Sequence, residues 1–352
     1  MNTIHWSVEK NVDNLDRYPQ IVEAAQYLSD DQVVAFPTET VYGLGANAYS
    51  DKAVAQIFAA KGRPADNPLI VHIAEYQQLE KLVIEVSEQA KLLIKAFWPG
   101  PLTLIFPRKP GILSELVTAG LDTVAIRMPS HPIALALIRT SGLPIAAPSA
   151  NRSGKPSPTT AQHVEQDLSG KIAGIVDGGA AGVGLESTVL DCTGQKPVIL
   201  RPGDITKEEM EVVLSNKMSL ASNVLGKSES PRAPGMKYKH YSPNAPLYLV
   251  DGESTWIQSL IKEKREQGVK VGVLASTETK IAYDADLVLD CGSRKNLAAV
   301  ARQLYDNLRK FDQTGVDLIF AEVFPKSGVG VAIMNRLEKA AGHHWIFQKD
   351  QS

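Results

Sequence analysis

The sequence predicts two α/β domains: an N-terminal mixed domain built on a twisted sheet, and a smaller C-terminal domain with a parallel, Rossmann-like sheet. The chain has 352 residues, more than one hydrophobic core usually organises. Short apolar runs alternate with helical stretches along both halves. Between them lies a segment without periodicity, rich in proline, glycine, serine and basic residues. We therefore predict a first domain over residues 1–217, a linker over 218–246 and a second domain over 247–352.

In the first domain, apolar runs predict strands and amphipathic stretches predict helices. The predicted strands are residues 33–36, 69–73, 102–106, 123–127, 145–147, 172–176, 188–191 and 198–200. The predicted helices are residues 18–28, 52–60, 88–97 and 132–139, with a further helix that starts from a capping box at 159–162 and reaches about residue 168. Strands outnumber helices, so we expect a mixed α/β domain. The order of the strands in its sheet cannot be predicted from the sequence.

The second domain alternates regularly between strands and helices. Its predicted strands are residues 247–250, 271–275, 287–290 and 318–323, and its predicted helices are residues 256–266, 297–311 and 331–341. This alternation is typical of a small parallel sheet with helices on its faces.

Composition narrows the functional class. Hydrophobic residues make up 44% of the chain and charged residues 22%, as in an ordinary soluble globular protein, and the formal net charge is −2. Such a net charge argues against a protein that binds nucleic acid by bulk electrostatics, but it does not exclude a local basic cleft. The start has no signal-peptide pattern and no apolar run is long enough to span a bilayer, so we expect a cytoplasmic protein without membrane contact. The two cysteines, Cys192 and Cys291, are expected to be buried and reduced rather than zinc ligands.

Several nucleotide motifs are absent or misplaced. The segment GLGANA at 43–48 fits a loose dinucleotide-binding pattern, but it lacks the tight strand-to-helix turn and the later acidic residue that the pattern requires. The glycine pair at 328–330 is too short to be informative. Neither a phosphate loop of the GxxxxGK[ST] type nor an HExxH zinc motif is present.

Two loops supply the first candidate ligand groups. The loop FPTETVYGLG at 36–45 is rich in hydroxyls and follows a predicted strand, where α/β proteins place ligands; the alternative is a structural turn. In KGRPADNP at 61–68, Gly62 ends a helix and Pro64 prevents it from resuming, so Lys61 and Arg63 are expected to project from a short fixed loop. Two fixed cations suit a polyphosphate. The alternative is that they only complement the helix dipole.

Further candidates follow later in the chain. The loop APSANRSGKPSPT at 147–159 is held by three prolines, and its hydroxyls, its amide and the next helix N-terminus suit a phosphate or a nucleobase; the alternative is a surface loop. Segments 186–189 and 200–203 each place one polar group at a strand end. His72 stands inside a predicted strand, where a buried structural histidine is the alternative to a ligand contact.

Together and in this order, these stretches resemble the threonylcarbamoyl-AMP synthase family, whose catalytic unit is the YrdC-like domain. The resemblance runs from about residue 20 to residue 203 and is carried by FPTETVYGLG, KGRPADNP and SANRSGKPSPT. The linker motif KYKHYSP at 237–243 and the C-terminal α/β domain resemble the long, two-domain form. No single piece is specific, but the combination is.

The resemblance implies a role for individual residues. Catalysis is assigned to Lys61 and Arg63. The implied ATP-binding residues are Arg63, Asn67, Thr123, Ser149, Asn151, Ser157, Arg201, His240 and Tyr241, with His240 or Tyr241 closing the cleft from the linker. The implied threonine-binding residues are Thr40, His72, Arg127, Ala147 and Ser187.

The resemblance also implies the reaction and its partners. L-Threonine captures bicarbonate as a carbamate, which attacks the α-phosphate of ATP, with Mg²⁺ accompanying the triphosphate and no protein ligand for the metal identified. The product serves tRNA threonylcarbamoyl-transferase machinery, with weak RNA contact as a further expectation. Two rivals are a double-stranded-RNA-binding, translation-associated module and a carbamoyl-transfer enzyme of hydrogenase maturation. The net charge counts against the first, and the lack of zinc-finger cysteines counts against the second.

Overall fold

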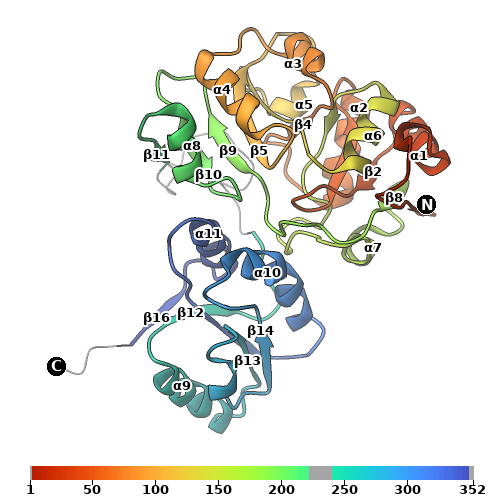
Figure 1. The fold of residues 1–352 in the computed structure, drawn as a ribbon. Helices are drawn as coiled ribbons and strands as arrows, with labels where there is room; N and C mark the ends of the chain where they lie inside the picture. The colour runs from red at the N-terminus through yellow and green to blue at the C-terminus, as the bar shows by residue number, and fades with distance from the viewer. Residues whose placement is uncertain (1, 222–239, 349–352) are drawn as a thin grey trace. The chain divides into compact units, whose positions relative to one another are not determined.

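The computed structural model describes residues 2–221 and 240–348 (Figure 1). The chain divides into two compact units. The first comprises Met1–Ser153 and Ser157–Lys237, and the second comprises Gly154–Pro156 and Tyr238–Ser352. Of the predicted linker, residues 222–239 lie outside the described residues. No helix in the described ranges is long and apolar enough to cross a lipid bilayer.

The first unit is built on an eleven-stranded mixed sheet in the order β1-β8-β2-β3-β7-β4-β6-β5-β9-β10-β11. The strands are β1 (Ile4–Ser7), β2 (Val34–Phe36), β3 (Gly43–Asn47), β4 (Ile70–His72), β5 (Leu102–Pro107), β6 (Thr123–Arg127), β7 (Ile145–Ala146), β8 (Gly174–Asp177), β9 (Thr188–Asp191), β10 (Val198–Arg201) and β11 (Ser219–Leu220). All eight predicted strands are present, with shifts of a residue or two at some ends. This confirms the predicted mixed α/β class of the first domain.

The helices of the first unit are α1 (Pro19–Ser29), α2 (Asp51–Lys61), α3 (Tyr76–Leu82), α4 (Glu88–Phe97), α5 (Glu115–Thr118), α6 (Pro132–Ser141), α7 (Ala161–Leu168) and α8 (Lys207–Leu214). The capping box predicted at 159–162, before α7, is wrong by one position. Thr160 is the N-cap and its hydroxyl accepts a hydrogen bond from the backbone N of His163, so the third helical residue is a histidine rather than a glutamine.

Glycine explains why β3 does not look like a strand in the sequence. The segment pairs antiparallel with β2, and Gly45 lies so close to its neighbours that a Cβ there would come within 2.8 Å of Ile145 and Phe36. A side chain at this position would clash, so glycine serves close packing here. The GLGANA segment is therefore a buried strand, which confirms that it is no dinucleotide-binding turn.

The second unit has a five-stranded parallel sheet in the order β14-β13-β15-β12-β16, with helices on both faces (Figure 1). Its strands are β12 (Leu247–Asp251), β13 (Val271–Ala275), β14 (Leu287–Asp290), β15 (Leu318–Glu322) and β16 (Trp345–Phe347), and its helices are α9 (Ser254–Glu266), α10 (Leu297–Phe311) and α11 (Gly330–Ala340). Every pairing in the sheet is parallel, as the strand–helix alternation predicted. The short strand β16 was not predicted.

Candidate active site

One end of the large sheet carries a row of polar residues from neighbouring strands. His72, the last residue of β4, is in register with Arg127, the last residue of β6, and Arg127 is in register with Thr103 on β5. The hydroxyls of Thr103 and Ser187 lie 2.7 Å apart, which extends the row to the start of β9. Arg201 on β10 then donates from Nε to the Ser187 carbonyl and from Nη2 to its hydroxyl, both at 3.1 Å. The sheet thus gathers residues that are 129 positions apart in the chain, from 72 to 201.

The row borders a small apolar floor made of strand residues alone. Ile70, Ile105, Ala125 and Val189 form a buried cluster, with Leu200 packed against it. Because strand side chains alternate between faces, Ile70 lies on the same face as His72, and Ala125 on the same face as Arg127. Elsewhere on this face, residues of α1 and α6 form the cover. The apolar cluster and the polar row therefore share one face of the sheet, a combination that suits a ligand with an apolar body and charged groups.

The hydroxyl-rich loop reaches the row through Thr40. Arg127 donates from Nη1 to the Thr40 hydroxyl at 2.9 Å and from Nε to the Gly100 carbonyl at 3.2 Å. The loop is held by Thr38, whose hydroxyl lies 2.8 Å from that of Thr40 and donates to the Val41 carbonyl at 2.6 Å. The structure therefore brings together Thr40, His72, Arg127 and Ser187, four of the five residues expected to bind threonine. The fifth, Ala147, lies beside β4, where its backbone N donates to the Ile70 carbonyl at 2.9 Å.

Lys61 is placed differently from the prediction. It is the last residue of α2 rather than a loop residue, and only 4% of its surface is exposed. Its ammonium donates to the carbonyls of Ser149 at 2.5 Å and Asn151 at 2.6 Å. The expectation that Lys61 projects from the loop is wrong, because these buried carbonyls attract the charged group inward. Lys61 thus joins the end of α2 to the loop that holds the predicted ATP-binding residues.

Arg63 and Asn67 lie in the short loop after α2. Gly62 ends the helix with φ 61°, as predicted. Arg63 is half-buried and donates from Nη2 to the carbonyls of Asn67 and Pro68, each at 3.2 Å. The side-chain amide of Asn67 is buried, yet neither its oxygen nor its nitrogen has a hydrogen-bond partner in the described structure. A buried amide without partners costs about 1–3 kcal/mol, so this side chain is ready to pair with a ligand.

Thr123 lies away from the polar row. It begins β6 whereas Arg127 ends it, a separation of roughly 13 Å at about 3.3 Å per residue. Asn67 precedes β4, which is parallel to β6, so Asn67 and Thr123 both lie toward the amino ends of these strands. Asn67 and Thr123, two of the predicted ATP-binding residues, therefore lie at the opposite end of this strand pair from His72 and Arg127. Arg201, also predicted to bind ATP, lies in the polar row itself.

Sequence reasoning missed three residues of this region. Thr103 contacts Ser187, Glu186 accepts a hydrogen bond from the Ser157 hydroxyl at 2.5 Å, and Glu39 lies against Arg127 with Oε1 2.6 Å from Nη2. Glu39 and Glu186 stand directly before Thr40 and Ser187 in the noted motifs, which was a usable signal. Their partners are distant in the chain, so nothing in the sequence indicated these contacts.

The remaining predicted residues, His240 and Tyr241, belong to the second unit. The ring of Tyr241 stacks on Tyr305 with centroids 5.2 Å apart, and the Arg336 guanidinium lies 5.7 Å from its centroid. Their contribution to ATP binding stays a prediction.

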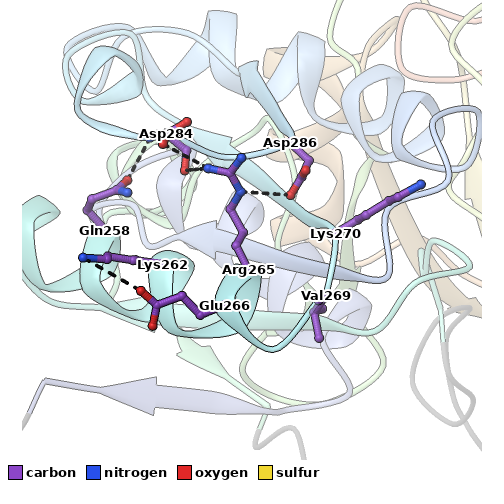
Figure 2. Close-up of a pocket in the computed structure, with 9 residues that line it drawn as sticks. Gln258, Lys262, Arg265, Glu266, Val269, Lys270, Asp284 and Asp286 are labelled. Atoms are coloured by element: carbon purple, nitrogen blue, oxygen red, sulfur yellow. Dashed lines mark hydrogen bonds and ion pairs between the residues drawn. The ribbon is translucent and has the colours of Figure 1, made fainter.

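The hollow in Figure 2 lies in the second unit and contains none of the predicted residues. It has a volume of about 510 Å³ and lies where β13 and β14 begin, opposite the strand ends at which α/β proteins usually bind ligands. Arg265 points between Asp284, at 3.0 Å, and Asp286, at 3.5 Å. Since these charges are exposed and already neutralise one another, we assign no function to this hollow.

Two buried histidines of the first unit should make the protein sensitive to acid. Burial, followed by the nearby charge of Arg127, lowers the pKa of His72 to about 3. Burial, followed by the charge of Lys10, lowers the pKa of His131 to about 4. Both imidazoles are therefore neutral at pH 7 in the native state.

We expect the free energy of unfolding to fall as the pH drops from 7.0 to 5.5. Unfolded histidines titrate near pH 6.5, so in this window the unfolded chain binds protons that the native state excludes. Each histidine should contribute about 1 kcal/mol to the loss. Urea unfolding at both pH values should show a loss smaller by about that amount in His131→Gln. An identical loss in the variant and the natural protein would contradict the assignment.

Comparison with known proteins places this geometry in a family. Residues 26–203 match the family model described as "Telomere recombination" (Sua5_yciO_yrdC), and residues 205–342 match the model described as "Threonylcarbamoyl-AMP synthase, C-terminal domain". A threonylcarbamoyl-AMP synthase of Bacillus subtilis is 58% identical over 97% of this chain and 99% of its own length. The chain belongs to the threonylcarbamoyl-AMP synthase family. Another member, from Pyrococcus abyssi, is 52% identical over 92% of this chain and 94% of its own length.

A solved structure supports the same assignment for both units. The crystal structure of P. abyssi Sua5 complexed with L-threonine superposes with a TM-score of 0.92 and 48% identity, covering 99% of this chain and 100% of that chain. The family membership confirms the resemblance inferred from the three motifs, and the fold of this relative agrees with a mixed sheet followed by a second α/β unit.

Proposed function

We propose that this protein condenses L-threonine, bicarbonate and ATP into threonylcarbamoyl-AMP and pyrophosphate. The observation that carries the proposal is the convergence of Thr40, His72, Arg127 and Ser187, from four separate segments, at one end of the sheet. Related proteins carry the name of this activity, and one was crystallised with L-threonine. The product would supply tRNA threonylcarbamoyl-transferase machinery in the cytoplasm, for the N6-threonylcarbamoyladenosine next to the anticodon.

In this proposal the protein acts mainly by positioning and by charge. The threonine amine forms a carbamate, and a carbamate oxygen attacks the α-phosphate of ATP while pyrophosphate leaves. Arg63 and Arg201 supply cationic donors for the phosphates, and Lys61 holds the loop of Ser149 and Asn151 against them. Because a carbamate decomposes in water, the burial of Thr40, His72 and Ser187 favours its survival until the attack.

Magnesium would enter with the triphosphate as part of the substrate. Within residues 2–221 and 240–348, no group of three or more histidine, cysteine, aspartate or glutamate side chains is arranged to hold a metal ion. The described residues therefore do not fit a dedicated protein site for the metal. Mg²⁺ commonly binds through substrate phosphates and water, with few protein ligands.

A coupled assay of pyrophosphate release tests the proposal. Release should require ATP, threonine and bicarbonate together and should need no RNA. Leaving out each component in turn is the control. Equal release without threonine, or a requirement for RNA, would contradict the proposed reaction.

Threonine should be preferred to serine by a factor of about 10–200 in kcat/KM. The two substrates differ by one methyl group, and contact with one methyl or methylene contributes about 1–3 kcal/mol. Steady-state kinetics with both amino acids measure the ratio. Equal values would show that the site does not sense the methyl group and would weaken the substrate assignment.

A further inference from the structure

Glu39 has a buried carboxylate whose hydrogen-bonding capacity is unused. Its side chain is 14% exposed, and Oε1 lies 2.6 Å from Nη2 of Arg127. Both carboxylate oxygens are buried and accept no hydrogen bond within the described part of the chain. A carboxylate offers about four acceptor positions, so the ion pair with Arg127 leaves several of them unfilled.

The backbone fixes this carboxylate beside the proposed threonine site. The Glu39 carbonyl accepts a hydrogen bond from the backbone N of Val183 at 2.7 Å, and the Thr40 carbonyl accepts one from Gly184 at 3.1 Å. The Thr38 hydroxyl accepts from the backbone N of Thr40 and of Val41, at 3.2 and 3.3 Å. Glu39 therefore sits in a rigid turn, in contact with the same arginine that holds Thr40.

An amino acid zwitterion matches the pair formed by Glu39 and Arg127. Its carboxylate complements the guanidinium, and its ammonium group can donate up to three hydrogen bonds to the empty acceptor positions of Glu39. We propose that Glu39 binds the ammonium group of threonine and accepts a proton from it as the carbamate forms. This inference rests on the proposed function.

The proton balance of the step requires such an acceptor. The ammonium nitrogen loses two protons when it becomes the N–H of the carbamate. One proton goes to the hydroxyl of bicarbonate, which leaves as water when its C–O bond breaks and the new N–C bond forms. The other proton goes to Glu39, which becomes a neutral acid and later returns it to solvent. Neutral Glu39 no longer repels the carbamate, and Arg127 is then released from its ion pair to hold the substrate carboxylate.

The other titratable groups nearby are less suitable. Burial lowers the pKa of His72 to about 3 and that of His131 to about 4, so both imidazoles are neutral at pH 7 and neither offers a negative charge to the ammonium group. Asp204 is the main rival, because burial, followed by the charges of Glu209 and Glu39, raises its pKa. Glu39 forms an ion pair with Arg127, whereas Asp204, within the residues that the structure describes, forms neither an ion pair nor a hydrogen bond with this arginine.

Two reactions of Glu39→Gln separate a proton acceptor from a structural counter-ion. The first is forward synthesis from threonine, bicarbonate and ATP. The second is a single turnover in reverse, in which excess enzyme converts purified threonylcarbamoyl-AMP and pyrophosphate into ATP. Only the forward reaction needs a proton removed from the threonine ammonium group before the phosphate is attacked.

We expect Glu39→Gln to lose at least about 100-fold in forward turnover, while ATP formation in the reverse single turnover stays within about 5-fold of the natural protein. Forward activity of the variant should rise with pH above 8, as hydroxide and the free amine replace the missing base. Glu39→Asp, which keeps the charge but shortens the side chain, should recover part of the rate. Glu23→Gln, an exposed glutamate on α1, is the matched control and should behave like the natural protein.

Three results would overturn the inference. Equal losses in both directions would make Glu39 a structural counter-ion of Arg127. Unchanged forward turnover would give it no role, and a larger, pH-rescued loss in Asp204→Asn than in Glu39→Gln would assign the proton to Asp204. Failure of the proposed function is recognised separately, because the natural protein itself would then form no threonylcarbamoyl-AMP.

Discussion

Replacement of Lys61 by alanine is expected to lower turnover by about 100-fold or more. The ammonium group donates to the Ser149 and Asn151 carbonyls, so its loss leaves two buried acceptors without their donor and loosens the loop that carries these predicted ATP-binding residues. It also removes a buried positive charge beside the loop that is proposed to hold the phosphates. Losing a charge-assisted contact that acts in the transition state costs about 3 kcal/mol, which corresponds to roughly two decades of rate.

Two further variants show whether this loss reflects the site or the fold. Lys61→Met keeps the buried aliphatic stem without the charge, and it should lose a similar factor while retaining its melting temperature more fully. Lys52→Ala removes an exposed lysine from the same helix and should leave turnover unchanged. Near-normal pyrophosphate release by Lys61→Met would refute a role for the ammonium group.

Replacement of Arg127 by lysine should reduce kcat/KM for threonine by about 100-fold and leave the KM for ATP little changed. The charge is retained, but a single ammonium group cannot reproduce the guanidinium geometry. In the natural protein, Nε, Nη1 and Nη2 face three different partners: the Gly100 carbonyl, the Thr40 hydroxyl and the Glu39 carboxylate. Loss of this fork should cost about 3 kcal/mol in binding and orienting the amino acid.

The matched control for Arg127 is Arg139→Lys. Arg139 forms an ion pair with Asp16 in which both side chains are about half-exposed, and such pairs contribute little. Titration with threonine at saturating ATP and bicarbonate, and with ATP at saturating threonine, would separate the two KM values. A large increase in the KM for ATP with an unchanged KM for threonine would place Arg127 in the nucleotide site instead.

The strands and helices that could be predicted are those indicated by a pattern within their own residues. The apolar runs at 69–73 and 123–127 are buried strands because nearly all their side chains avoid water, and no partner strand is needed to see this. Strand β3 escaped prediction because Gly43 and Gly45 look like a loop. Only the nearness of Phe36 and Ile145 shows why glycine is required there.

The candidate site was predictable as a set of residues but not as an arrangement. Thr40, His72, Arg127 and Ser187 came from a resemblance, and only strand register shows that His72 and Arg127 are neighbours. The position of Lys61 was predicted wrongly because nothing near it in the sequence indicates that the Ser149 and Asn151 carbonyls, 88 and 90 residues later, face its ammonium group. The contact between Glu39 and Arg127 was missed for the same reason: it spans 88 positions.

Isotope-labelled product analysis tests the central claim most directly. The protein is incubated with ATP, L-threonine and ¹³C-bicarbonate, without RNA, and the nucleotide products are identified by mass spectrometry. The account predicts an AMP adduct with the mass of threonylcarbamoyl-AMP, heavier by one mass unit than the product from unlabelled bicarbonate and absent when threonine is left out. Threonyl-AMP lacking the label, or AMP alone under conditions where the adduct is stable, would contradict it.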